Sequence, residues 1–207
     1  MTDQLPKLYL ARHGETEWSR SGQHTSHTDI PLTARGEENA RRLVERLKGI
    51  VPTTVFTSPL IRARRTCELA GYGPVAVVEP DLVEWDYGDY EGRRTVDIRQ
   101  ERPGWRLFRD GCPNGESFEA VRERADRVIA RIRTIEGDVL AFGHSHFLRI
   151  LTARWLGLPV ADARLLVLST ASLSILGYEH ALDEPAIRLW NDDRHLTEFS
   201  SPAARSD

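Results

Sequence analysis

Cysteine is scarce in this chain of 207 residues, which contains only Cys67 and Cys112. Two cysteines are too few for a disulfide framework, and neither stands in a paired spacing such as C-x-x-C that holds zinc. We therefore expect both to be reduced thiols that take no part in the chemistry.

Long apolar runs are also absent. None approaches the roughly 18 residues of a membrane-spanning helix, and residues 1–7 lack the basic-then-apolar pattern of a secretory signal. The formal net charge of −3 gives no overall attraction to nucleic acid or to an anionic membrane. The sequence therefore predicts a cytoplasmic protein without nucleic-acid or membrane partners, in which local positive groups hold any bound anion.

In other respects the composition is that of an ordinary globular protein, with 40% hydrophobic and 29% charged residues. The length is sufficient for one domain with a sizeable core, and nothing in the sequence requires two. We predict a single domain over residues 1–207, with residues 200–207 as a loose tail.

Short apolar runs alternate with helical spacing along the chain. Thr33 is predicted to cap a helix with Ala40, Leu43, Val44 and Leu47 on its buried side, and Pro59 to occupy the first position of the next helix. The alternation predicts a three-layer α/β/α sandwich with a mostly parallel central sheet. Strands are expected at residues 8–11, 55–57, 75–78, 138–142, 171–178 and 186–190, and further long helices at 118–132 and 147–156.

The sequence Arg12-His13-Gly14-Glu15 follows the first of these strands directly. A lone histidine is more often a surface residue, or a core residue whose hydrogen bonds are satisfied, than a catalytic residue. A guanidinium beside an imidazole at a strand end, however, suits a nucleophile aimed at a phosphate whose charge the arginine holds.

Two other positively charged candidates stand near strand ends. Arg62 lies in the first turn of a helix, whereas Arg64 and Arg65 are expected on the surface. His144 follows the strand at residues 138–142. Because the ends of parallel strands share one edge of a sheet, His13, Arg62 and His144 are expected to converge there.

A proton donor is expected between residues 84 and 92, where acidic groups alternate with aromatic residues and glycines. A carboxyl group beside large apolar rings is partly desolvated, which raises its pKa and lets it hold a proton near neutrality. Sequence position does not choose among the four carboxylates in this stretch, which are Glu84, Asp86, Asp89 and Glu91.

The polar stretch at residues 17–30 is predicted to be a loop. Its small hydroxyls suit the recognition of phosphate or sugar oxygens, although loops commonly contain such residues. The spacing of His24 and His27 is compatible with two ligands of a zinc ion, but no cysteine or carboxylate at a suitable spacing completes such a site. We expect no metal and leave the roles of both histidines open.

Several motifs together resemble the histidine phosphatase superfamily, also called phosphoglycerate mutase-like. The RHG signature lies within residues 10–16, and the match continues through 31–36, 57–66, Glu84 and 143–149. A narrower resemblance, in residues 84–92, 109–116 and 177–186, is to the branch that contains sedoheptulose-1,7-bisphosphatase and related bacterial acid phosphatases.

The resemblance implies a site and a reaction. His13 would be the nucleophile that becomes phosphohistidine and Glu84 the proton donor, while Arg12, Arg62 and a protonated His144 would hold the phosphate. Further contacts to the substrate are implied for Ser19, Thr25, Ser26, Tyr87 and Ser145. His146 replaces a small residue often found in the family, and its role stays open.

The expected activity is a phosphatase acting on small phosphate monoesters, with sugar bisphosphates such as sedoheptulose 1,7-bisphosphate as a plausible substrate. The alternatives are a phosphoglycerate mutase-type isomerase and a broad-specificity acid phosphatase without a dedicated sugar substrate. No cofactor is expected, and the expected partner is a small phosphorylated metabolite. A homo-oligomer is possible, with residues 171–176 either at its interface or simply within the sheet.

Overall fold

The computed structural model describes residues 5–196. Six strands form one sheet in the order β3-β2-β4-β1-β5-β6. The strands β1 to β4 pair in parallel, whereas β5 pairs antiparallel with both β1 and β6. The predicted mostly parallel sheet is therefore confirmed, with an antiparallel hairpin at one edge. The strands are β1 (Leu8–Arg12), β2 (Thr54–Thr57), β3 (Ala76–Val78), β4 (Val139–Gly143), β5 (Leu173–Tyr178) and β6 (Pro185–Asp192).

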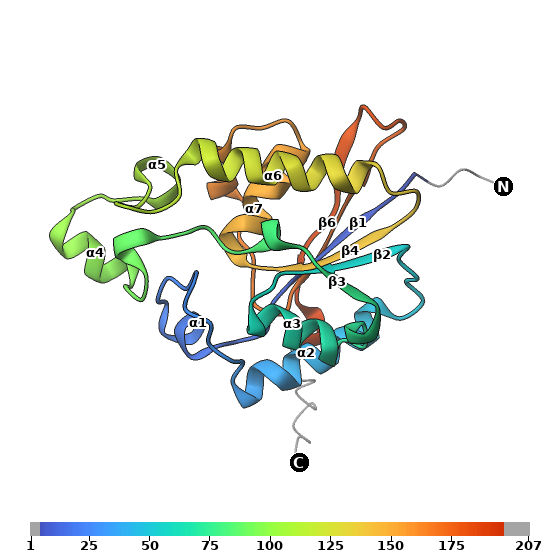
Figure 1. Cartoon of the computed structure of the whole chain (residues 1–207), viewed down its shortest axis with the longest axis horizontal. Coiled ribbons are helices and arrows are strands. Elements are labelled where there is room, and N and C mark those ends of the chain that lie inside the picture. The colour runs from blue at the N-terminus through green and yellow to red at the C-terminus, as the bar shows by residue number, and fades with distance from the viewer. Residues whose placement is uncertain (1–4, 197–207) are drawn as a thin grey trace, which may run out of the picture.

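Helices cover both faces of this sheet, which confirms the three-layer sandwich (Figure 1). Helices α2 (Ala34–Leu47) and α3 (Ile61–Leu69) lie on one face, and α6 (Phe118–Arg133) and α7 (Ser145–Trp155) lie on the other. Three short helices, α1 (Glu17–Ser21), α4 (Thr95–Glu101) and α5 (Leu107–Asp110), lie beyond the carboxyl ends of the parallel strands, on the left of Figure 1. Short 3₁₀ turns span Gly73–Val75, Pro80–Leu82, Gly88–Tyr90, Val160–Leu165 and Arg194–Leu196.

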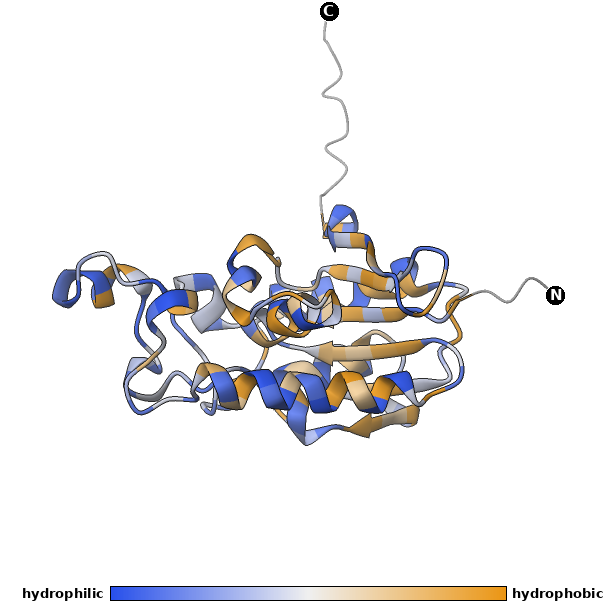
Figure 2. Cartoon of the chain, turned by 90° about the horizontal axis from the view of Figure 1, so that it is seen from above, coloured by the Kyte–Doolittle hydropathy of each residue, from blue (hydrophilic) through white to orange (hydrophobic). Residues whose placement is uncertain are grey.

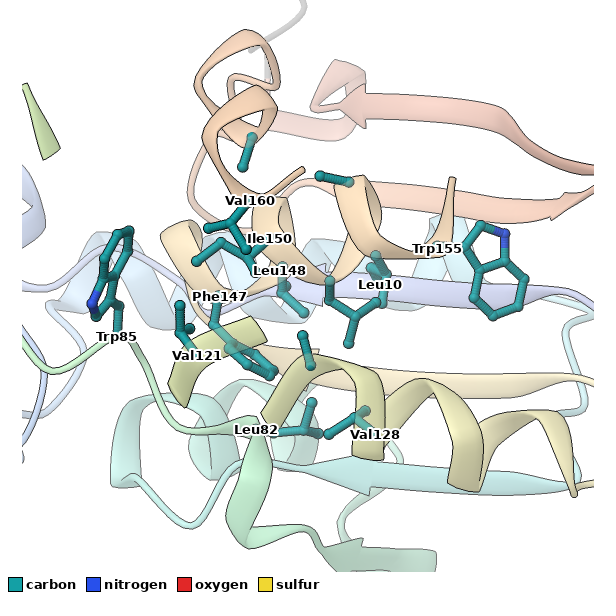
Figure 3. Packing of buried hydrophobic residues seen from close by; sticks show 14 of the residues in the cluster. Leu10, Leu82, Trp85, Val121, Val128, Phe147, Leu148, Ile150, Trp155 and Val160 are labelled. Carbon is teal, nitrogen blue, oxygen red and sulfur yellow. The ribbon is translucent and has the colours of Figure 1, made fainter. Parts of the chain in front are cut away.

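The central strands contribute side chains to two apolar layers. In β1, Leu8 and Leu10 pack toward α6 and α7, while Tyr9 and Ala11 pack toward α2 and α3. A strand buried on both faces needs apolar residues at every position, which explains the continuous apolar run in the sequence. Figure 2 shows the strands mostly in the hydrophobic colour and the helices banded with both colours. Figure 3 shows the layer beneath α6 and α7, where Leu10, Val128 and Leu148 lie together.

Of the two predicted helix starts, one is confirmed and one is wrong. Thr33 caps α2 as predicted, with its side chain accepting a hydrogen bond from Gly36 N. Pro59, however, is not the first residue of α3, because that helix begins at Ile61 after Leu60. Asp29 accepts the Ile61 N–H at 2.8 Å, so a side chain distant in sequence caps this helix.

Two further expectations differ from the structure. Val44 is 45% exposed, because it lies at the margin of the buried stripe of α2 and not at its centre. Part of the predicted loop forms α1, which a capping box between Thr16 and Ser19 stabilises. The apolar segment at residues 171–176, for which two placements were open, ends in β5 and lies inside the sheet between β1 and β6, as one of them has it. The predicted tail at residues 200–207 lies outside the described residues.

No helix among residues 5–196 is long and apolar enough to cross a membrane.

Candidate active site

The parallel register of β1 and β4 brings two histidines together. Arg12, the last residue of β1, is opposite Gly143, the last residue of β4. The next residues, His13 and His144, therefore leave the sheet side by side, and their ring centroids are 5.2 Å apart. The His13 N–H also donates to Gly143 O at 3.0 Å. The convergence expected for these two histidines is present.

The loop that carries His13 is held by a close backbone approach. A Cβ atom on Gly14 would lie 2.4 Å from Gly36 O in α2, so only glycine fits at this position. The Gly14 N–H donates to Thr66 Oγ1 of α3 at 2.9 Å. These two contacts lock the end of β1 against both helices on that face of the sheet.

The His13 ring has a defined tautomer. Its Nδ1 lies 2.7 Å from Gly14 O. Because a carbonyl oxygen only accepts hydrogen bonds, Nδ1 carries the proton and Nε2 keeps its lone pair. Burial lowers the pKa of His13 well below its usual value, and the nearby Arg62 and Arg12 lower it further. A neutral imidazole with a free Nε2 is the form required of a nucleophile.

Arg62 is fully buried, as its position in the first turn of α3 predicted. Its Nη atoms donate to the carbonyl oxygens of Thr25, Ser26 and Thr28 at distances between 3.0 and 3.2 Å. These bonds tie the loop before α2 to the guanidinium. In the same helix, Arg64 is exposed and Arg65 pairs with Glu37 and Glu68.

Several buried nitrogens around the two histidines have no hydrogen-bond partner. Of five such side-chain nitrogens among residues 5–196, three are Arg12 Nε, Arg62 Nε and His144 Nδ1. A buried donor without a partner costs about 1–3 kcal/mol. An anion with several acceptor oxygens would satisfy such donors, and phosphate is an anion of this kind.

His144 is held by Ser58, which sequence reasoning did not single out. Its Nε2 lies 2.8 Å from Ser58 Oγ, and Ser58 follows β2, the neighbour of β4 on the other side. Burial lowers the pKa of His144 well below its usual value, and Arg62, His13 and Arg12 lower it further. The structure therefore favours a neutral His144 in the enzyme without substrate, whereas the sequence-based interpretation had a protonated one.

Glu84 is the carboxylate of its segment that reaches this site. It is 3% exposed. Its Oε1 accepts from the N–H groups of Trp85 at 2.9 Å and Phe147 at 2.7 Å, and its Oε2 accepts from His146 N at 3.0 Å. Two of these donors belong to the first turn of α7, where a helix favours negative charge. The other three candidate carboxylates bond elsewhere: Asp86 to Gly88 N, Asp89 to Asn114, and Glu91 to the N–H groups of Ser26 and Thr28.

These groups surround a cavity of about 230 Å³ at the carboxyl end of the sheet. Its lining includes Arg12, His13 and Glu84. Four of the five residues implied as substrate contacts also line it, namely Ser19, Thr25, Tyr87 and Ser145. Ser26, the fifth, is 1% exposed and does not belong to the lining, because its backbone groups bond to Arg62 and Glu91. Arg62 and His144 are fully buried and are not among the lining residues.

Comparison with known proteins agrees with this geometry. Residues 8–193 match the histidine phosphatase superfamily (branch 1). The chain belongs to this superfamily. It is 40% identical to an acid phosphatase of Mycobacterium tuberculosis over 186 residues, covering 87% of this chain and 91% of the relative. It is 34% identical to sedoheptulose 1,7-bisphosphatase of Saccharomyces cerevisiae over 256 residues, covering 91% of this chain and 94% of the relative.

Another relative is a probable phosphoglycerate mutase of Cronobacter sakazakii. It is 33% identical over 185 residues, covering 84% of this chain and 86% of the relative. A solved structure of an open reading frame of Mycobacterium tuberculosis matches with a TM-score of 0.86 and 37% identity, covering 91% of this chain and 98% of that one. The phosphoglycerate mutase-like fold and the phosphatase class of this enzyme are therefore established.

This histidine phosphatase also has cavity residues that the sequence did not indicate. Gly22, Gln23 and Thr95 line the cavity, and a backbone bridge between Gln23 and Arg94 brings the start of α4 over it. No local pattern marks these residues, because their contact is made between segments about 70 positions apart.

The cavity wall of the phosphatase contains a packed group of rings. Tyr87 Oη lies 2.6 Å from His146 Nδ1, and the ring of His24 lies 4.8 Å from that of Tyr87. Burial lowers the pKa of His24 to about 4 and that of His146 well below its usual value. His27 lies apart from this group, exposed and 3.3 Å from Asp86. Among the described residues, no three histidine, cysteine or acidic side chains gather as metal ligands.

The buried histidines predict a fall in stability on acidification. The pKa of His24 is about 4 in the folded protein and about 6.5 in the unfolded chain. Below pH 6.5 the unfolded chain takes up a proton that the folded protein does not, so stability falls until the pH reaches about 4. We expect His24 alone to remove about 3 kcal/mol of unfolding free energy over this interval.

Urea unfolding at pH 7.5, 6.0 and 4.5 measures this effect. The decline should be shallower in His24→Phe than in the wild type, and unchanged in His27→Phe, because His27 is exposed. Equal declines in all three proteins would contradict the assignment to His24.

Proposed function

We propose that this enzyme hydrolyses small phosphate monoesters through a phosphohistidine on His13, with sugar bisphosphates such as sedoheptulose 1,7-bisphosphate as the substrate class. The observation that carries the proposal is the neutral His13 ring, which has a free Nε2 and lies near the guanidiniums of Arg12 and Arg62. Glu84, on the wall of the same cavity, supplies the acid and base.

In the first half of the proposed reaction, His13 Nε2 attacks phosphorus and the bond from phosphorus to the ester oxygen breaks. Glu84 gives its proton to the departing alkoxide. The free donors of Arg12, Arg62 and His144 hold the equatorial oxygens of the transferring group. A bound phosphate dianion beside His144 favours protonation of that ring, so the protonated form belongs to the complex.

In the second half, water attacks the phosphohistidine and the bond from phosphorus to nitrogen breaks. The Glu84 carboxylate accepts the proton of the water, which restores the acid for the next cycle and releases inorganic phosphate. The hydrogen bond from Nδ1 to Gly14 O stabilises the positive charge that the phosphorylated ring carries. Two guanidiniums supply the positive charge that metal ions supply in other phosphatases, so we propose no cofactor.

The choice of substrate rests on relatives. One relative is named a sedoheptulose 1,7-bisphosphatase and another an acid phosphatase, so a sugar bisphosphate and a broad range of monoesters are the two candidates. A mutase is the remaining alternative, since one relative is named a probable phosphoglycerate mutase. A mutase has to keep the phosphohistidine and return its phosphoryl group to a bound acid.

Phosphate release from a panel of metabolites separates these activities. The panel contains sedoheptulose 1,7-bisphosphate, fructose 1,6-bisphosphate, glycerol 3-phosphate and 3-phosphoglycerate. We expect phosphate release from the sugar bisphosphates with a kcat/KM at least about tenfold above that for glycerol 3-phosphate, a difference of about 1.4 kcal/mol. Equal values for all esters would indicate a broad acid phosphatase. Conversion of 3-phosphoglycerate to its isomer without phosphate release would indicate a mutase.

A further inference from the structure

A second, larger cavity adjoins the catalytic one. Its volume is about 650 Å³, and both cavities are lined by His24, Thr95 and His146. These three shared residues place the second cavity directly beside the one that contains His13. The wall of this cavity comes from α4, α5, α7 and the Val160–Leu165 turn.

The second cavity has a positively charged wall in a protein whose net charge is −3. Its lining contains five arginines and no aspartate or glutamate. Two of them are neutralised by neighbouring carboxylates: Arg109 by Asp110 at 2.8 Å, and Arg164 by Asp162 at 2.6 Å. The other three, which are Arg99, Arg106 and Arg149, form no ion pair with a carboxylate within residues 5–196.

Arg149 is the best positioned of these three. Its guanidinium carbon lies 4.6 Å from the centroid of the Phe108 ring. Its Nε and Nη2 donate to the carbonyl oxygens of Ala163 at 3.0 Å and Arg164 at 3.3 Å. Burial lowers the pKa of Arg149 to about 10, so the group stays charged at neutral pH. A half-buried guanidinium that is fixed in place and has no carboxylate within ion-pair distance is suited to bind an anion from outside the chain.

The rest of the wall is apolar. Trp105, Leu107, Phe108 and Phe118 contribute to it. Such a surface accommodates a carbon skeleton between two charged groups, one held at His13 and the other by the arginines.

We propose that the second cavity binds a distal anionic group of the substrate, so that the enzyme selects phosphate esters whose leaving group carries a second phosphate or a carboxylate. This inference rests on the proposed function for the identity of the ligand. It assigns Arg149 and Arg106 as the residues that distinguish such esters from those with an uncharged leaving group.

Binding measurements in a His13→Ala background test the proposal without depending on turnover. One pair of ligands is fructose 1,6-bisphosphate and fructose 1-phosphate, which differ by a second phosphate. The other pair is 3-phosphoglycerate and glycerol 3-phosphate, which differ by a carboxylate. We expect Kd to be at least tenfold lower for the doubly anionic member of at least one pair, and the pair that shows the larger ratio identifies the distal group.

Variants then locate the preference. Arg106→Gln and Arg149→Gln should each reduce the Kd ratio at least fivefold, mainly by weakening the doubly anionic ligand. Matched controls are Arg109→Gln and Arg164→Gln, whose arginines line the same cavity but already pair with carboxylates. They should leave the ratio within twofold of its original value. The exposed Arg106 keeps the test valid if Arg149→Gln does not fold.

Two results would overturn the proposal. One is a Kd ratio near one for both ligand pairs in the parent protein. The other is an equal loss of affinity for both members of a pair in Arg106→Gln and Arg149→Gln. If the wild type releases no phosphate but the Kd preference is present, the proposed hydrolysis is overturned. The distal site remains supported in that case.

Discussion

Replacing His13 with alanine is expected to lower kcat by at least about 10⁴-fold, because the covalent route through phosphohistidine is lost. The alanine removes His13 Nε2, a ring nitrogen with a free lone pair on a residue that lines the cavity together with Arg12. The other ring at the strand ends, His144, has its Nε2 beside Ser58 and its Nδ1 buried without a partner. Initial rates of phosphate release from glycerol 3-phosphate and a sugar bisphosphate measure the effect.

A control separates chemistry from folding. The fold should survive in His13→Ala, because β1 is held by its pairing with β4 and β5 and by the contacts of Gly14. Thermal unfolding should confirm this, and His27→Ala, which changes an exposed histidine, should retain normal turnover. Rapid quenching of the wild type should trap an acid-labile phosphoprotein that the His13→Ala protein lacks. A His13→Ala enzyme within tenfold of the wild-type kcat would end the proposed mechanism.

Replacing Glu84 with glutamine has the second largest expected effect, and the effect depends on the leaving group. For alkyl phosphates the amide has no proton to give to the alkoxide, and kcat should fall by roughly 10²–10⁴-fold. For 4-nitrophenyl phosphate the leaving group needs no proton, so the first half of the reaction should stay fast. The second half lacks its base, so the phosphoenzyme should accumulate. Stopped-flow absorbance should show a burst of one nitrophenolate per site followed by slow turnover.

The structural consequence of this substitution is limited and measurable. Glu84 accepts three N–H bonds, and the amide of glutamine would place its own N–H against one of them, at a cost of about 1–3 kcal/mol. Asp86→Asn is a matched control, because Asp86 belongs to the same segment but bonds to Gly88 outside the catalytic cavity. Equal losses on both kinds of ester, with no burst, would show that Glu84 is not the proton donor.

Local patterns in the sequence predicted most of the elements that position the site. Strands buried on both faces need continuous apolar runs, as in Leu8–Arg12 and Val139–Gly143, and α2 begins at a visible cap, Thr33. The polar residues directly after such runs, His13 and His144, were therefore identifiable as candidates at a strand end. The capping box of α1 went unrecognised within a hydroxyl-rich stretch that reads as a loop.

The sequence by itself determined the layered α/β architecture and the strand ends that carry His13 and His144, because both follow from periodicity over a few residues. Only the tertiary structure decided that Glu84 lines the same cavity as His13, that Ser58 holds His144, and that arginines without a carboxylate partner on α4, directly before α5 and on α7 line one cavity. Those arrangements depend on the register between β1, β2 and β4 and on the packing of segments distant in the chain. Local periodicity contains no information about either.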